Sequence, residues 1–183
     1  MKFTPQEIPE IILFEPNLYG DKRGYFYETY IEESFNKAVG YNVNFVQDNE
    51  SKSSRGVLRG LHYQMYPYAQ SKLLRVVSGK VLDVVVDIRQ SSKSFGEHLS
   101  FEISSQNKHQ LFVPQGFAQG FVVLSESAIF SYKVDNYYSP DYERGIAFDD
   151  KDLAIDWKLP KELIKLSDRD KKNPNLSESE NLF

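Results

Sequence analysis

The chain has 183 residues, of which 40% are hydrophobic and 14% aromatic, so it is long and apolar enough for one domain with a sizeable core. Its formal net charge of −4 argues against broad nucleic-acid binding, because no surplus of basic side chains can displace phosphate counterions. The absence of cysteine excludes disulfides and thiolate metal sites and is compatible with a reducing cytosol. We therefore expect one cytoplasmic domain over residues 1–183, with a polar C-terminal tail from about 171 that frays at its end and with no nucleic-acid or membrane partner.

Short β-type runs rich in Val, Ile, Phe and Tyr follow one another along the chain, separated by Gly, Pro, Asn, Asp and Ser. They cover residues 24–30, 42–49, 57–64, 72–89, 98–104, 109–116, 119–126 and 128–138. The letters "SGK" at 78–80 predict a tight turn that folds the longest run into a hairpin, with Gly79 at positive φ. This spacing of strands is typical of an all-β sandwich, jelly roll or barrel.

Helix is scarce in this pattern. Residues 32–40 predict a two-turn helix, acidic at its start and stopped by Gly40. A second short helix is expected over 160–166, with Pro160 at its first position.

The run "LRGLHYQ" at 58–64 places cationic side chains within an apolar strand. Strict alternation would separate Arg59 from His62, but the glycine between them can break the alternation and let both reach one cavity. Lys72 in "QSKLL" and Arg23 in "GDKRGYFYE" add further cations. Arginine and lysine bind phosphate groups, so these residues indicate either a desolvated anion site or surface charges on edge strands.

His62 is a candidate general base rather than a metal ligand. A metal site on these strands needs three or four ligands, commonly with a His-x-His pair, and here Tyr63 and Gln64 follow His62, so we expect no metal. A neutral imidazole is a natural base near neutral pH if a carboxylate orients it, although spacing alone does not select the carboxylate. The matching acid could be a tyrosine of "FSYKVDNYYSP", namely Tyr132, Tyr137 or Tyr138, or these tyrosines could only pack.

The chain resembles the dTDP-4-dehydrorhamnose 3,5-epimerases, which are metal-free cupins that act on sugar nucleotides. The resemblance rests on eight stretches that occur in the family's order and spacing: "GDKRGYFYE", "FVQDNESKS", "VLRGLHYQ", "AQSKLLRVVSGKVLDVVVDIR", "FGEHL", "LFVPQGFAQGFVVLSE", "YKVDNYYSP" and "LSDRD". It implies a cupin jelly roll that forms homodimers, with an aromatic or basic residue contributed across the dimer. It also implies a nucleotide-diphosphate 4-keto-6-deoxy sugar as substrate and no metal or nicotinamide cofactor.

The resemblance assigns roles to individual residues. His62 would be the base, Asp170 its orienting carboxylate, Tyr132 the acid on the opposite face and Lys72 the group that stabilises the enolate oxygen at C4. The remaining pocket residues that it implies are Arg23, Phe26, Glu28, Gln47, Asn49, Arg59, Gln119, Tyr138 and Tyr19.

The chain departs from the family pattern at one pocket position. The family usually has "FAHGF", whereas this chain has "FAQGF", and Gln119 cannot titrate near neutral pH. The segment "QMYPYAQ" at 64–70 is aromatic where the family is often polar, a second hint of an altered pocket. The reading of an epimerase acting at C3, C5 or both stands ahead of three alternatives: an epimerase of GDP-linked 4-keto heptoses in capsule pathways, a 3,4-ketoisomerase, and a cupin that only binds a sugar nucleotide.

Overall fold

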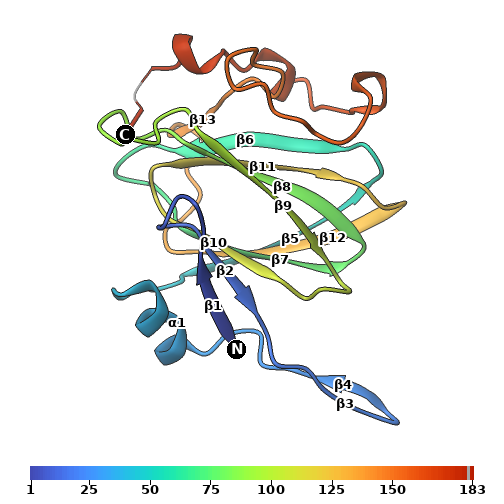
Figure 1. Ribbon diagram of the computed structural model, residues 1–183. Helices are drawn as coiled ribbons and strands as arrows, with labels where there is room; N and C mark the ends of the chain where they lie inside the picture. The colour runs from blue at the N-terminus through green and yellow to red at the C-terminus, as the bar shows by residue number, and fades with distance from the viewer. Residues whose placement is uncertain (181) are drawn as a thin grey trace.

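The computed structural model describes residues 1–180 and 182–183, and its main body is a sandwich of antiparallel strands (Figure 1). The strands are β1 (Lys2–Pro5), β2 (Ile12–Glu15), β3 (Tyr19–Asp21), β4 (Gly24–Phe26), β5 (Gln47–Ser54), β6 (Leu58–Gln64), β7 (Lys72–Ser78), β8 (Lys80–Asp87), β9 (His98–Ser104), β10 (Gln110–Val113), β11 (Phe117–Val123), β12 (Ser127–Val134) and β13 (Glu143–Gly145). One sheet has the order β1-β2-β10-β7-β12-β5, and the other has the order β13-β6-β11-β8-β9. The all-β jelly-roll prediction is confirmed.

Strand β8 shows how the sequence builds two cores at once. Its odd-numbered residues Val81 and Val85 belong to the cluster between the two sheets. Its even-numbered residues Leu82, Val84 and Val86 belong to a second cluster on the outer face of the five-stranded sheet. Both faces of this sheet are therefore covered, which explains a nearly continuous apolar run instead of a polar–apolar alternation.

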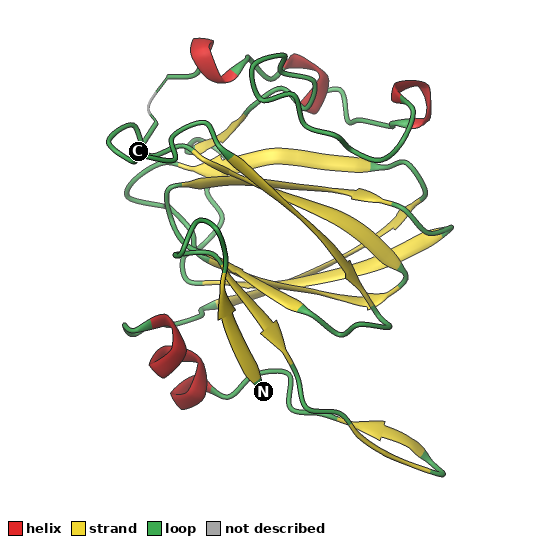
Figure 2. Cartoon of the chain, viewed as in Figure 1, coloured by secondary structure: helices red, strands yellow, loops and turns green. Residues whose placement is uncertain are grey.

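The predicted helix over 32–40 is confirmed as α1 (Glu32–Val39), which ends at Gly40 in the left-handed region with φ 88°. Its buried residue Phe35 packs on Phe14 and Phe112 of the six-stranded sheet. Helix α1 therefore covers part of the face of that sheet that points away from the sandwich (Figure 2).

The predicted hairpin at 78–80 is wrong, because β7 and β8 belong to different sheets. Gly79, with φ 81°, lies where the chain crosses from one sheet to the other. A Cβ at this position would lie 2.1 Å from the carbonyl oxygen of Ser127, so the corner requires glycine for space as well as for conformation. A glycine in a long apolar run is equally compatible with a hairpin and with a crossing between two sheets. The strands that pair with β7 and β8 decide which of the two forms.

Strand ends differ from the prediction mainly where side chains are polar. The run over 24–30 yields only the three residues of β4, and the run over 42–49 begins too early, because β5 is Gln47–Ser54. Strand β5 reads "QDNESKSS" and is an edge strand that pairs with β12 along its full length. Its hydrogen-bond ladder, not apolar side chains, makes it a strand. The short strands β1, β2, β3 and β13 were not predicted.

The C-terminal segment lies over the outer face of the five-stranded sheet (Figure 1). The expected helix over 160–166 is only a 3₁₀ turn, η1 (Lys161–Leu163), and Pro160 precedes it. Two further turns, η2 (Asp170–Lys172) and η3 (Leu176–Glu178), follow.

The described residues of the tail, 171–180 and 182–183, contact the rest of the chain, and the frayed end stays a prediction. Leu176 is buried, and the Phe183 backbone N–H donates to the carbonyl of Ile88. The Phe183 ring also packs on Tyr66. No helix among the described residues has both the length and the apolar character needed to cross a membrane.

Candidate active site

Strand β6 carries a bulge that turns Arg59 and His62 toward the space between the sheets. Leu58 and Leu61 are three residues apart, yet both pack in the outer cluster, so the alternation breaks between them. The pairing of β6 with β11 shifts register at this point, and a Cβ on Gly60 would lie 2.5 Å from the Cα of Gly120. The expected effect of the glycine is confirmed, because Arg59 and His62 line the same cavity.

This cavity has a volume of about 690 Å³ and opens between the two sheets. Its size is in the range of small-molecule sites. The four residues expected to be catalytic, His62, Lys72, Tyr132 and Asp170, all line it. Of the residues expected to bind substrate, it is lined by Asn49, Arg59, Gln119 and Tyr138.

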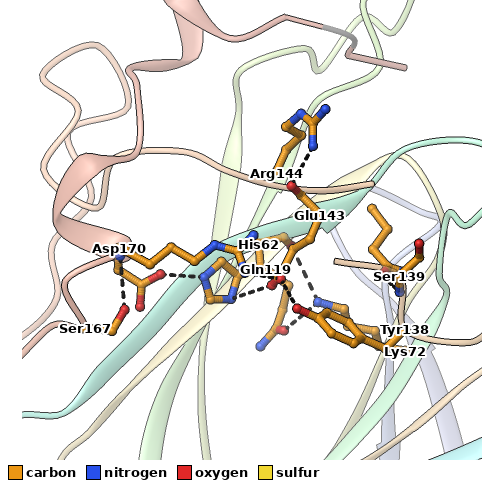
Figure 3. Close-up of polar contacts among 11 residues, drawn as sticks. His62, Lys72, Gln119, Tyr138, Ser139, Glu143, Arg144, Ser167 and Asp170 are labelled. Carbon is orange, nitrogen blue, oxygen red and sulfur yellow. Dashed lines mark hydrogen bonds and ion pairs between the residues drawn. The ribbon is translucent and has the colours of Figure 1, made fainter. Parts of the chain in front are cut away.

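His62 lies between two carboxylates (Figure 3). Its Nε2 is 2.6 Å from the Oδ1 of Asp170, and its Nδ1 is 4.0 Å from the Oε1 of Glu143. An ionised carboxylate only accepts hydrogen bonds, so the His62 proton resides on Nε2 and Nδ1 keeps a lone pair. Asp170 therefore fixes both the ring orientation and the tautomer of His62.

Asp170 reaches His62 from 108 residues further along the chain. Lys165 exchanges backbone hydrogen bonds with Gly56 and Leu58 at the start of β6, and the chain then continues to η2 beside that strand. Burial alone would raise the pKa of the Asp170 carboxyl. The hydrogen bond from His62, with help from Ser167 and Arg169, lowers that pKa overall, so Asp170 is ionised near neutral pH.

Lys72 and Tyr132 enter the cavity from the opposite, six-stranded sheet. Burial lowers the pKa of Lys72 to about 8, against the opposing charges of Asp83 and Glu143. Burial also raises the pKa of the Tyr132 hydroxyl, and the negative charge of Glu143 adds to this effect. Near neutral pH the cavity therefore holds a protonated phenol on the side opposite His62.

Gln119 occupies the wall between these groups. It lies directly opposite His62 in the pairing of β11 with β6 and is 7% exposed. Its Nε2 donates to the Oδ2 of Asp83 at 2.6 Å, and its Oε1 accepts from the Nζ of Lys72 at 3.2 Å. Asp83 was not predicted, although a carboxylate flanked by the apolar residues of "VLDVVV" is a signal that could have found it.

Two further polar residues at the cavity, Glu143 and Arg169, were also not predicted. Glu143 on β13 accepts a hydrogen bond from the Tyr138 hydroxyl at 2.7 Å, and Arg169 donates to the same carboxylate. Glu143 lies in a polar stretch without periodicity, so no sequence pattern singles it out. Arg169 lies inside the "LSDRD" motif, but the resemblance to the family assigned a role only to its neighbour Asp170.

Arg59 and Asn49 complete the polar wall near β5, and Gln47 lies next to it. The Nε of Arg59 donates to the hydroxyl of Ser53 at 3.1 Å. The amide of Gln47 donates to the Oδ1 of Asn49 at 2.8 Å, and its Oε1 accepts from the backbone N–H of Tyr138 at 3.4 Å. Gln47 thus supports two lining residues without lining the cavity itself.

Besides Gln47, four of the residues expected to bind substrate do not line this cavity. Tyr19, Arg23 and Phe26 belong to the β3–β4 hairpin, which forms a separate two-stranded sheet and projects away from the sandwich (Figure 1). Tyr19 and Phe26 are 59% and 66% exposed, and the Arg23 guanidinium pairs with Asp21. Glu28, in the segment after the hairpin, is exposed. These four side chains therefore do not line the cavity of their own chain.

The aromatic segment at 64–70 does not line the cavity, contrary to the hint of an altered pocket. Tyr66 packs on Phe183, and Tyr68 packs on Tyr142. In the described part of the chain, no three His, Cys, Asp or Glu side chains lie in an arrangement that could hold a metal ion.

Comparisons with known proteins agree with the geometry. The family model described as dTDP-4-dehydrorhamnose 3,5-epimerase matches residues 5–178. The chain is 52% identical to an enzyme of that description from Shigella flexneri, over 93% of each chain. It is similar to the crystal structure of such an enzyme from Elizabethkingia anophelis, with 48% identity, a TM-score of 0.94 and coverage of 99% and 98% of the two chains. A 3,5-epimerase from Legionella pneumophila, solved with dTDP-4-keto-L-rhamnose, shows 44% identity, a TM-score of 0.93 and coverage of 97% and 93%.

Proposed function

The chain belongs to the dTDP-4-dehydrorhamnose 3,5-epimerase family, and we propose that its cavity inverts C3 and C5 of a dTDP-linked 4-keto-6-deoxy sugar. It is an enzyme of the isomerase class with a cupin fold. The cavity draws on both sheets and on residues 165–170, so we treat residues 1–183 as one catalytic domain.

The chemistry follows from the ketone at C4. Protons on C3 and C5 are acidic because the electron pair left behind moves into the C4 carbonyl as an enolate. Inversion requires removal of the proton from one face and its return to the other. The enzyme must therefore offer a base, an acid on the opposite side and a cation at the enolate oxygen.

One observation carries the proposal: His62, hydrogen-bonded to Asp170 of η2, lies on one sheet, and Tyr132 faces the same cavity from the other sheet. In the proposed step, the Nδ1 of His62 takes the proton from carbon, and the Tyr132 hydroxyl gives its proton to the opposite face of the enolate. The imidazolium then loses its proton to solvent and the tyrosinate regains one, which restores both groups.

Lys72 supplies the cation for the enolate oxygen. Its Nζ lies in the cavity wall, and with a pKa of about 8 it is an ammonium ion at neutral pH. Arg59 and Asn49 line the same cavity and can contact the diphosphate and the sugar hydroxyls. No metal or redox cofactor has a role in this sequence of proton transfers.

The protein should act as a homodimer in which the β3–β4 hairpin completes the partner's cavity. Support comes from the exposure of Tyr19 and Phe26 on a projecting hairpin, and from the absence of Arg23 from its own cavity. Large exposed aromatic side chains next to an arginine suit a nucleoside diphosphate as well as a protein interface.

Mixed dimers test this shared site. Assayed alone at substrate concentrations below KM, subunits with His62→Asn should be inactive and subunits with Arg23→Ala should be weakly active. Their random mixture should recover about a quarter of the parent activity, because half of the dimers are mixed and each mixed dimer has one intact site. Absence of recovery, or a monomer in sedimentation at micromolar concentration, would exclude the shared site.

The proposed function is tested with dTDP-4-keto-6-deoxyglucose in deuterated water. NMR should show deuterium entering at C3 and C5 together with the epimerised product, and EDTA treatment should not change the rate. Exchange at one carbon only would restrict the reaction to a single centre. Transfer of the carbonyl from C4 to C3 would instead identify a 3,4-ketoisomerase, and faster turnover of a GDP-linked 4-keto heptose would reassign the substrate.

A further inference from the structure

Three side chains from three strands form a continuous hydrogen-bonded row in the wall of the cavity. Asp83 on β8 accepts from the Nε2 of Gln119 on β11 at 2.6 Å, and the Oε1 of Gln119 accepts from the Nζ of Lys72 on β7 at 3.2 Å. Asp83 is 0% exposed and does not line the cavity, so it has no direct access to a substrate.

Asp83 lacks the partners that a buried carboxylate normally has. Its Oδ1 has no hydrogen-bond partner among the described residues, and its Oδ2 has only the Gln119 amide. Burial raises the pKa of the Asp83 carboxyl well above its ordinary value, while the Gln119 hydrogen bond and the charge of Lys72 oppose the rise. An under-solvated carboxylate of this kind is costly for stability, and in this chain it is joined through Gln119 to Lys72.

The Gln119 amide links the two charged groups with a fixed polarity, because one end only donates and the other only accepts. An ionised Asp83 requires the NH₂ end, which turns the Oε1 toward Lys72 as an acceptor for its ammonium. A group at position 83 that donates a proton would attract the Oε1 instead. The NH₂ end of Gln119 would then face the ammonium group of Lys72, and two donors would face each other without an acceptor.

We propose that Asp83 is a positioning residue that acts through the Gln119 amide to hold Lys72 as an ammonium ion aimed into the cavity. Glutamine does not titrate, so Asp83 and Lys72 are the members of this row whose charge depends on pH. The role of the Lys72 ammonium at the enolate oxygen rests on the proposed function, whereas the coupling of Asp83 to Lys72 does not.

Other groups of the cavity also act on Lys72. Glu143 on β13 also favours its charged form, and the backbone carbonyl of His62 on β6 accepts from its Nζ at 3.5 Å. Removal of the Asp83 charge should therefore weaken the ammonium form of Lys72 but not eliminate it.

The test is to titrate Lys72 by NMR in protein labelled with ¹³C at the lysine Cε, with the resonance assigned by its loss in Lys72→Arg. The parent midpoint should lie near 8, and Asp83→Asn should move it to lower pH. The kcat of Asp83→Asn at pH 8 should fall about tenfold, since Lys72 would then be largely a neutral amine. The deficit should shrink as the pH is lowered, which a merely structural role does not explain.

Asp87→Asn is the matched control. Asp87 is also 0% exposed on β8, but its partners are Arg89 and Ser94, so its loss should lower stability and leave the Lys72 midpoint in place. If Asp83→Asn does not fold, Gln119→Leu interrupts the same row and should lower the midpoint in the same way. An unchanged midpoint in the folded variant, or equal shifts in Asp83→Asn and Asp87→Asn, would overturn the proposal. If the midpoint moves as expected but the parent enzyme does not turn over 4-keto sugars, only the proposed function fails.

Discussion

The substitution His62→Asn is expected to abolish deuterium exchange at both C3 and C5, a loss of about 10⁴-fold or more, because it removes the only group in the proposed mechanism that takes a proton from carbon. Asparagine keeps a polar side chain in the cavity but has no lone pair basic enough for this step. A loss of 10⁴ corresponds to about 5.5 kcal/mol in the activation free energy. Such an effect is too large for a change in substrate binding alone.

Asp170→Asn should have a smaller effect, about 10²–10³-fold, within the range that acid–base catalysis spans. The imidazole remains, but its Nε2 no longer faces an anion at 2.6 Å. Two consequences follow: the tautomer is no longer fixed, and the imidazolium formed during proton abstraction loses its counter-ion. The order of the two losses, His62 above Asp170, distinguishes a base from the group that orients it.

A structural role of His62 predicts different results from the same samples. If the histidine only satisfied a hydrogen bond in the wall, His62→Asn would lower the melting temperature and reduce activity only in proportion to the loss of folded protein. His98→Asn provides a control, since His98 is half-buried at the start of β9, outside the cavity. A folded His62→Asn variant that exchanges the substrate's protons at the parent rate would show that His62 is not the base.

The sequence predicts the inward-facing cations of the cavity better than its anions. Arg59 and Lys72 stand out because each is a charge inside an apolar strand, and the glycine beside Arg59 explains how alternation can fail there. Asp170 has no such signal, because it lies in a polar segment whose position depends on backbone hydrogen bonds between Lys165 and the start of β6. Only the resemblance to a family selected it among many carboxylates.

Sheet membership is the other feature that the sequence does not determine. The glycine at 79 is compatible with a hairpin and with a corner between sheets, and long-range pairing with β10 and β12 on one side and with β9 and β11 on the other decides the outcome. The polar strand β5 was placed too early for the same reason, since its partner β12 is about 80 residues away in the chain. Local sequence patterns indicate which residues are buried. The sheet to which β8 belongs and the bounds of β5 depend instead on the strands with which they pair.

The substitution Tyr132→Phe is expected to separate proton removal from inversion. His62 and Asp170 remain, so the enzyme should still exchange the substrate's protons with deuterated water, because the base returns a solvent-derived proton to the face from which it removed one. Net inversion should fall by about 10²–10⁴-fold, since no acid is left on the opposite side. The measurement is to follow exchange and product in one NMR time course.

Tyr137→Phe is the matched control for Tyr132→Phe. Tyr137 lies in the same aromatic stretch, but it is 62% exposed and does not line the cavity, so its variant should exchange and invert at the parent rates. Burial and the Glu143 charge raise the pKa of Tyr132, which keeps the phenol protonated through neutral pH and suits it to donate. Inversion by Tyr132→Phe at the parent rate would reduce Tyr132 to a packing residue and would require another acid on that side of the cavity. Loss of exchange together with inversion would instead mean that both protons depend on Tyr132, and the division of labour between the two sheets would be wrong.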